Sequence, residues 1–249
     1  MTQPKENYGQ DAPVVVRNLA IIGGAILVGT WTTGANGFWF RQLPGWVLAL
    51  RPTLVATGWA LAAMAAWMVI SSRWLKPLVL KSLLDQQAWR GDEAVLDIGC
   101  GRGLVAIAAA RRAPDGYVTG IDLWQEADLA GNNPAATHAN AVAAGVADRL
   151  TIDTGDARAL PYPDASFDVV ASMTAIHNIP DAAGRTTAIA EAWRVTRPGG
   201  QILIYDIRHA RAYAAQLKTL GAVDIRMSWP ILLWGVLGWR FAATKPSVG

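Results

Sequence analysis

The pattern Asp97-x-Gly99-x-Gly101-x-Gly103 is the strongest chemical signal in the chain. A short apolar run ends at Asp97, and an alanine-rich apolar run typical of a helix follows the last glycine. A strand, a glycine-rich turn and a helix are the layout of a nucleotide-binding βα unit. Glycine suits such a turn because it adopts positive φ and lets a ligand approach the backbone. The helix that follows offers unpaired N–H groups.

Two kinds of ligand fit this turn. Gly101-x-Gly103-x-x-Ala106 can be aligned with the dinucleotide pattern G-x-G-x-x-G/A, which indicates a pyrophosphate. The carboxylate of Asp97, however, is poorly placed beside a pyrophosphate and suits a cation, such as a ligand with an ammonium and a sulfonium group. A glycine-rich turn without a ligand is the third alternative. We expect Cys100, in the same turn, to be a small packed residue rather than a reactive thiol.

Acidic residues also follow the next two expected strands. Asp122 lies about 20 residues after the glycines, where an acid commonly accepts hydrogen bonds from ribose hydroxyls. Leu123 and Trp124 come next and are placed to pack on an adenine ring. Asp156 and Ala157 follow a third strand. There a carboxylate can accept from an adenine amino group while a backbone N–H donates to the ring.

Together with 160–170 and 194–200, these segments resemble in order and spacing the motifs of the class I S-adenosylmethionine (SAM) dependent methyltransferases. The resemblance covers residues 92–243. It implies SAM as the cofactor and a seven-stranded sheet whose last strand is antiparallel. It places the methionine end of SAM against Asp97, Gly99 and Gly101. It places the ribose against Asp122, and the adenine against Asp156 and Ala157. We add their neighbours Cys100 and Leu123 to the predicted cofactor site.

Methyl transfer needs an acceptor atom held in line with the methyl carbon, and a base where the acceptor carries a proton. Open α/β sheets bind ligands at the carboxyl ends of their strands. His177 follows the fourth expected strand, and Tyr205 and Asp206 end the fifth. We predict that these three residues contact the acceptor or remove its proton. The alternative for His177 is a structural or solvated side chain.

From Gly91 onward, short apolar segments alternate with helical patterns, which predicts an α/β fold with a doubly wound, mostly parallel sheet. The expected strands are 94–98, 117–122, 150–153, 167–172, 201–206, 223–227 and 239–244. The expected helices between them are 104–112, 133–144, 182–196 and 210–220. No helical pattern separates the last two strands, so we expect them to pair as an antiparallel hairpin.

Residues 1–90 form the predicted membrane region, and 91–249 the methyltransferase domain. Two uncharged stretches, 18–40 and 53–72, have about the 20 residues that a helix needs to cross a bilayer. Six of the twelve tryptophans lie in the first 75 residues, and tryptophan is typical of the membrane–water boundary. Buried core helices, or one span with an interfacial helix, are the alternatives. The polar residues 1–13 are expected to be loosely held.

Two further segments predict contact with a membrane. Arg73, Lys76 and Lys81 follow the second stretch directly, which by the positive-inside tendency places this end in the cytoplasm. Residues 73–89 are expected either to form an amphipathic helix on the membrane surface or to be the first helix packed on the sheet. The uncharged segment 229–238 is too short to span. It is expected to dip into the bilayer or to pack on the N-terminal helices.

Composition narrows the choice of partners. The chain is 52% apolar and only 16% charged, which favours membrane contact. A net charge of +3 without a basic block predicts no nucleic-acid partner, and no histidine–cysteine spacing indicates a metal site. The prediction is a membrane-anchored methyltransferase with a cytoplasmic catalytic domain and a small lipophilic acceptor, such as a quinone, isoprenoid, phospholipid, or lipophilic thiol or amine. An NAD(P)-dependent oxidoreductase and a non-catalytic scaffold are the alternatives, and the oligomeric state stays open.

Overall fold

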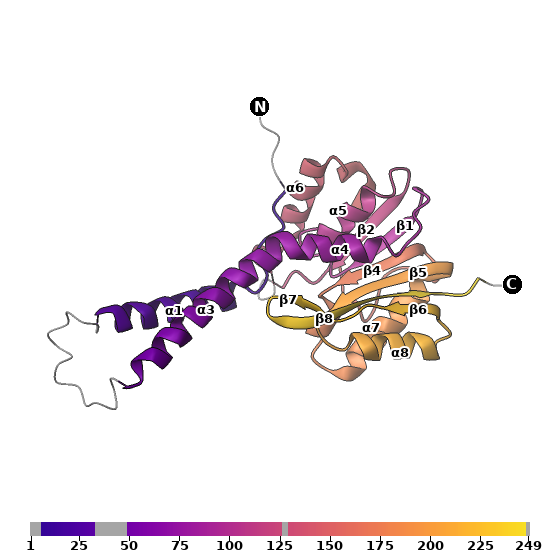
Figure 1. Cartoon of the computed structure of the whole chain (residues 1–249). Helices are drawn as coiled ribbons and strands as arrows, with labels where there is room; N and C mark the ends of the chain where they lie inside the picture. Colours follow the sequence, from indigo (N-terminus) through magenta and orange to yellow (C-terminus); the bar gives the residue numbers. More distant parts are fainter. Residues whose placement is uncertain (1–5, 33–48, 126–128, 248–249) are drawn as a thin grey trace.

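The computed structural model describes residues 6–32, 49–125 and 129–247 and shows a long helix pair that projects from an α/β unit (Figure 1). The α/β unit has the mostly parallel sheet that the alternating pattern predicts. Its strands are β1 Ala94–Ile98, β2 Tyr117–Asp122, β3 Leu150–Thr154, β4 Phe167–Met173, β5 Thr196–Asp206, β6 Val223–Met227, β7 Ile231–Leu233 and β8 Val236–Thr244.

The strand order is β3-β2-β1-β4-β5-β8-β6. The first five strands of the sequence pair in parallel, and β8 pairs antiparallel with both β5 and β6. The predicted antiparallel strand at the end of the chain is therefore confirmed, and the short β7 pairs with β8 as an additional strand. Connections leave β1 toward β2 and return to β4 on its other side, so the order reverses at β1. A ligand crevice is expected outside this point.

Helices cover both faces of the sheet. The helices are α4 Lys76–Leu84, α5 Leu104–Ala110, α6 Pro134–Ala144, α7 Ala182–Val195 and α8 Ala210–Thr219. One core lies between the sheet and α4, α5 and α6, and a second core lies between the sheet and α7 and α8 (Figure 1). Side-chain caps fix two helix starts, because Asn133 accepts from the N–H of Ala136 and Asp181 accepts from that of Gly184.

Helix α4 is an integral part of the α/β unit. Val79, Leu80, Leu83 and Leu84 are buried against the sheet. Burial of four large apolar side chains stabilises this docking by several kcal/mol, at about 1.5–3 kcal/mol for each. This placement favours the alternative in which residues 73–89 form the first helix packed on the sheet. Two apolar side chains of this segment remain on the surface, Trp74 and Leu78, each 62% exposed.

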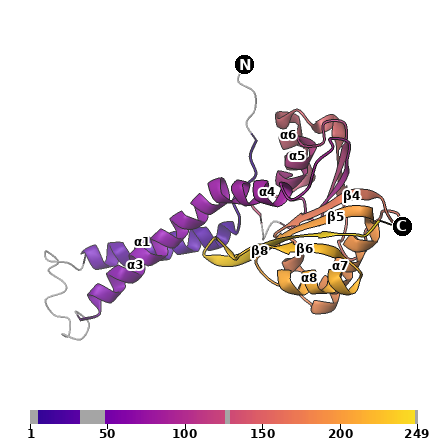
Figure 2. The ribbon, with the colours of Figure 1, turned by 45° about the vertical axis from the view of Figure 1, so that its right-hand side comes forward.

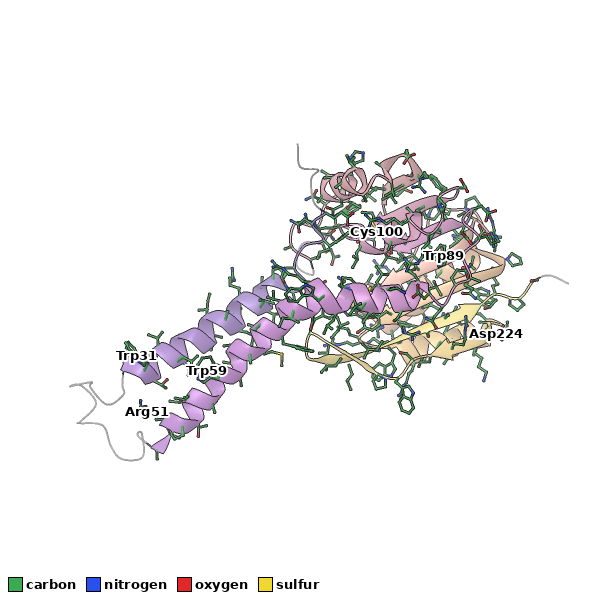
Figure 3. The ribbon with its side chains drawn as sticks, turned by 45° about the horizontal axis from the view of Figure 1, so that its top comes forward. Trp31, Arg51, Trp59, Trp89, Cys100 and Asp224 are labelled. Carbon is green, nitrogen blue, oxygen red and sulfur yellow. The ribbon has the colours of Figure 1, made fainter. Side chains whose placement is uncertain are left out.

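The helix pair consists of α1 Pro13–Thr32 and α3 Arg51–Ile70. The two helices approach closely at glycines, since a Cβ on Gly23 would lie 2.9 Å from the carbonyl oxygen of Gly58. By length and composition each helix can cross a membrane, and only 11% and 17% of their apolar windows are buried within the protein. Figure 3 places Trp31 and Arg51 at the end of the pair that lies away from the α/β unit. The predicted linker tryptophans Trp39 and Trp46 lie outside the described residues.

Helix α3 continues without a loop into the α/β unit. It passes through one π-helical turn, Ser71–Leu75, and runs on as α4. The candidate spanning segment accordingly extends over Arg51–Leu84. A π-helical turn inserts an extra residue and thereby changes which side chains face a neighbour, and such turns often occur at functional sites.

The β7–β8 hairpin lies beside the base of the helix pair (Figure 2). Its inner face packs on the helices: Leu233 is fully buried, and the Trp234 indole donates to the Ser72 hydroxyl at 2.9 Å. This packing agrees with the alternative in which residues 229–238 pack on the N-terminal helices. The outer face is apolar and exposed, with Trp229 at 89%, Leu232 at 50% and Leu237 at 49% exposed.

Candidate active site

A cleft lies at the carboxyl ends of β1, β2, β3 and β4, where the strand order predicts it. Its walls come from the segments that follow each of these strands and from two places in the first 90 residues. The predicted residues that line it are Gly99, Cys100, Gly101, Asp122, Leu123, Asp156 and Ala157. Its cavity volume is about 210 Å³.

Asp97 lies beneath the glycine turn rather than in the cleft wall. Its side chain is fully buried, and its Oδ2 accepts from the N–H of Ala106 at 2.9 Å, which fixes the start of α5 to β1. Its Oδ1 has no hydrogen-bond partner among the described residues. Burial, with a smaller contribution from the nearby charge of Asp122, raises the pKa of Asp97 to about 8. Because burial disfavours the ionised form of this carboxyl group, a cation bound next to it would stabilise that form strongly.

The glycine turn is too tightly packed to admit side chains. Gly99 has a φ of +72°, and a Cβ there would lie 2.1 Å from the Cβ of Ala175. The N–H groups of Gly99 and Cys100 both donate to the carbonyl of Ile121, at 2.8 and 3.1 Å, and bind the turn to β2. Burial raises the pKa of the Cys100 thiol well above its usual range, which agrees with a packed residue rather than a reactive one.

Asp122 holds the glycine turn in place from the end of β2. Its Oδ2 accepts from the N–H of Gly101 at 2.8 Å, and its Oδ1 accepts from the N–H of Trp124 at 2.6 Å. The Asn132 amide also donates to Oδ1 at 3.3 Å. Oδ2 keeps a second lone pair, so Asp122 can still accept from a ligand hydroxyl through that oxygen. Trp124 itself donates to Thr154 through its indole at 2.8 Å and is not among the lining residues, whereas Leu123 is.

Asp156 stands after β3 as an ionised acceptor. The Arg158 guanidinium contacts both of its oxygens, at 3.0 and 2.6 Å, and holds the pKa of Asp156 below its usual range. Both side chains line the cleft, with Ala157 between them. An ionised carboxylate next to a backbone N–H matches the edge of an adenine ring.

The three predicted catalytic residues lie behind the cleft wall. The ring nitrogen Nδ1 of His177 is 2.6 Å from Oδ1 of Asp206, without the alignment of a hydrogen bond. The backbone N–H of His177 donates to Oδ2 of Asp206 at 3.1 Å. Tyr205 is fully buried in the core on the α4 side of the sheet, and burial raises the pKa of its phenol. None of the three is among the lining residues, although Ile176 and Asn178, on either side of His177, are.

Several lining residues were not predicted. After β4 the wall continues through Met173, Ile176, Ile179 and Pro180. The glycine turn and its neighbourhood add Arg102, Leu129 and Asn132. More surprising are Tyr8, Asp11 and Lys76, which come from the predicted membrane region.

The segment 6–12 is fixed rather than loose. The Asn7 N–H donates to the Asn140 side chain at 2.8 Å, and Asp11 forms a β-bridge with Leu129. Gln10 donates to the Ser72 hydroxyl at 3.1 Å. The expectation of a loosely held start therefore fails for residues 6–12, because these polar side chains find partners on α6 and on the helix pair. Partners so distant in sequence leave no local pattern.

The residues present fit SAM better than a dinucleotide. Gly99 and Gly101 of the turn line the cleft, and a buried carboxyl oxygen of Asp97, without a partner among the described residues, lies below the turn. A ligand with an ammonium and a sulfonium group compensates that carboxylate, whereas a pyrophosphate would face both Asp97 and Asp122. Asp156, a hydrogen-bond acceptor, lies at the other end of the cleft, where an adenine amino group can donate to it.

Comparison with known proteins agrees with this assignment. Residues 96–204 match the protein family described as "Methyltransferase domain". A 27-O-demethylrifamycin SV methyltransferase of Amycolatopsis mediterranei is 42% identical over 117 residues, which are 47% of this chain and 39% of the relative. A ubiquinone/menaquinone biosynthesis C-methyltransferase of Dinoroseobacter shibae is 37% identical over 128 residues, 50% of this chain and 46% of the relative. The chain thus spans less than half the length of these relatives.

A solved structure shows the same fold. Geranyl diphosphate C-methyltransferase from Streptomyces coelicolor, solved with S-adenosyl-L-homocysteine, has a TM-score of 0.56 at 13% identity, over 69% of this chain and 79% of that chain. The fold, the glycine turn with its buried acid and the matched family agree. Residues 96–204 are thus similar to a methyltransferase domain, and the α/β unit has the fold of such a domain.

Proposed function

We propose that this protein is a membrane-anchored methyltransferase that moves the methyl group of SAM to a small lipophilic acceptor on the cytoplasmic side. One observation carries the proposal: the cleft that fits SAM is lined both by the methyltransferase domain and by residues next to the two apolar helices, Asp11 and Lys76. An enzyme whose cleft is built in part from its membrane region is well placed for an acceptor dissolved in that membrane. The basic residues that flank α3, Arg73, Lys76 and Lys81, support the cytoplasmic side.

SAM, when bound, supplies a methyl group on a sulfonium that is already a good leaving group. The protein's part is to orient the two reactants and to exclude water. The glycine turn and Asp122 fix the cofactor end, and Asp156 fixes the adenine end. The wall formed by Met173, Ile176 and other apolar residues after β4 shields the remaining space. His177 stays the predicted base, because its neighbours line the cleft and a base must stand within reach of the acceptor proton.

The acceptor wall is apolar, which favours a lipophilic acceptor. Met173, Ile176, Ile179 and Pro180 offer no charge to a polar substrate. One relative is named for ubiquinone and menaquinone biosynthesis and another for 27-O-demethylrifamycin SV. A quinone precursor is therefore the first acceptor to test.

The test is methyl transfer from SAM with a labelled methyl group. The full chain in nanodiscs is incubated with a lipid extract of its host membrane and, separately, with a water-soluble extract. We expect label in the lipid fraction, in a compound that chromatography and mass spectrometry then identify. Label only in water-soluble products would contradict the lipophilic acceptor, and no label with either extract would contradict the enzyme activity.

The outer face of the β7–β8 hairpin provides a separate test of the membrane. Leu237 is 49% exposed on that face, whereas the native Cys100 is buried, so Leu237→Cys can be labelled selectively with an environment-sensitive dye. In nanodiscs we expect lipid-borne quenchers to reach the dye at this position, because an exposed apolar face gains by entering the bilayer.

Asp224→Cys is the matched control. Asp224 is exposed on the side of the α/β unit away from the helix pair (Figure 3). A dye there should stay in water and escape the quencher. Equal quenching at both positions would show that the hairpin does not meet the lipid.

A further inference from the structure

Lys76 belongs to the membrane region in sequence and to the cofactor cleft in space. It is the first residue of α4, directly after the π-helical turn. Its side chain is only 12% exposed and lines the cleft. A buried ammonium costs several kcal/mol unless it is paired. Its position in the cleft therefore calls for a reason.

Two separate segments hold this lysine. Its Nζ lies 2.6 Å from Oδ1 of Asp11, on the segment before α1. It also lies 5.5 Å from the ring centre of Trp234 in the hairpin, as a cation–π contact. An ammonium has three N–H donors, and Asp11 is the hydrogen-bond acceptor for Lys76 among the described residues. The pairing leaves donors for a second anion.

The lysine lies at the end of the cleft that holds the glycine turn. Its partner Asp11 forms a β-bridge with Leu129, and the Leu129 side chain lies 2.9 Å from the position of a Cβ built on Gly101 of the turn. The positive charge of Lys76 also lowers the pKa of Asp97, against the larger effect of burial.

Of the other cations of the cleft, Arg158 pairs with Asp156 at the adenine end. Arg102 donates to the carbonyl of Ala130 at 3.1 Å and keeps a buried Nε without a hydrogen-bond partner among the described residues, so it is the alternative cation at this end.

The amino acid part of SAM carries an ammonium and a carboxylate. On the proposed function, its ammonium lies near Asp97, and its carboxylate then needs a cation at the same end of the cleft. We propose that the Nζ of Lys76 binds the methionine carboxylate of the cofactor, beside or in exchange with Asp11. The membrane region thereby completes the cofactor site. A hydrogen bond between charged groups of this kind contributes about 1.5–3 kcal/mol, or roughly 10- to 100-fold in affinity.

The experiment compares two ligands that differ in this carboxylate. S-adenosylhomocysteine has the amino acid part, and 5′-methylthioadenosine lacks it. Both dissociation constants are measured by calorimetry on the full chain in nanodiscs, for the wild type, Lys76→Gln and Lys81→Gln. Lys81 is the matched control on the same helix, because it is 67% exposed and pairs with Asp85. We expect Lys76→Gln to weaken the binding of S-adenosylhomocysteine roughly 10- to 100-fold and to leave the binding of 5′-methylthioadenosine unchanged. Lys81→Gln should change neither dissociation constant.

Other outcomes have distinct meanings. An equal loss for both ligands would show that Lys76 only supports the fold, and no loss for either would show that the carboxylate lies elsewhere; each overturns the inference. If Lys76→Gln does not fold, Lys76→Arg decides, since a retained charge should keep the preference for S-adenosylhomocysteine and a lost preference overturns the inference. A wild type that binds neither ligand would instead contradict the proposed function itself.

Discussion

Asp97→Asn is expected to stabilise the ligand-free protein at pH 8 and to weaken the binding of S-adenosylhomocysteine by about 10- to 100-fold. Burial raises the pKa of Asp97 from 3.8 to about 8. Between these values the unfolded chain carries the ionised group while the folded protein keeps the proton. The folded state therefore binds more protons, and its stability falls as the pH rises through this window. Asparagine removes that loss, which at about 1.36 kcal/mol for each pKa unit is at most about 5 kcal/mol at pH 8.

Denaturant unfolding of the full chain at pH 5 and pH 8 measures this effect, and calorimetry measures the ligand. Asp156 serves as a control of opposite sign, because Arg158 lowers its pKa and Asp156→Asn should lose stability at neutral pH rather than gain it. If Asp97→Asn is no more stable than the wild type at pH 8, Asp97 is already ionised in the empty cleft. Unchanged affinity would remove Asp97 from the cofactor site.

Gly99→Ala is expected to abolish binding of S-adenosylhomocysteine and to destabilise the fold by about 2–5 kcal/mol. Two effects combine. An alanine at φ +72° is strained, and its Cβ would lie 2.1 Å from the Cβ of Ala175. The turn can relieve this contact only by moving the backbone against which the ligand would lie.

Gly145→Ala separates the two effects. Gly145 ends α6 with a φ of +70°, and nothing lies within 4 Å of a Cβ built there. This variant should lose only the ~1–2 kcal/mol of left-handed strain and bind ligand as the wild type does. Unfolding and calorimetry on the two variants give the difference. If Gly99→Ala loses no more stability than Gly145→Ala and keeps its affinity, the turn is not the rigid cradle described above.

Local pattern predicted most of the fold. The bounds of β1 and β2 agree with the expectation because each apolar run is closed by an acid and followed by a break in pattern. The expected strand 201–206 instead begins at Thr196 in the structure, since its first residues are polar and partly exposed. The short β7 and the early start of β8 were hidden in the uncharged segment 229–238, which has no alternation to mark strands.

The site was predictable where one short motif carries it. The glycine turn, Asp122 and Asp156 follow strands that neighbour each other, so parallel pairing brings them together. The pairing of Asp11 with Lys76 joins residues 65 positions apart and depends on how α4 docks. Tyr205 was misleading for another reason: side chains alternate along a strand, and its position points into the core. Whether His177, Tyr205 and Asp206 take part in catalysis stays a prediction.

The unbroken passage from α3 through the π-helical turn into α4 also bears on how such an enzyme would meet its substrate. A flexible tether lets a domain tumble away from the surface, whereas a continuous helix holds it at one height and in one orientation. If the helix pair spans the bilayer, the cleft would sample acceptors by lateral diffusion in two dimensions. Turnover would then follow the mole fraction of acceptor among the lipids, and diluting the vesicles in buffer would leave the rate per enzyme unchanged.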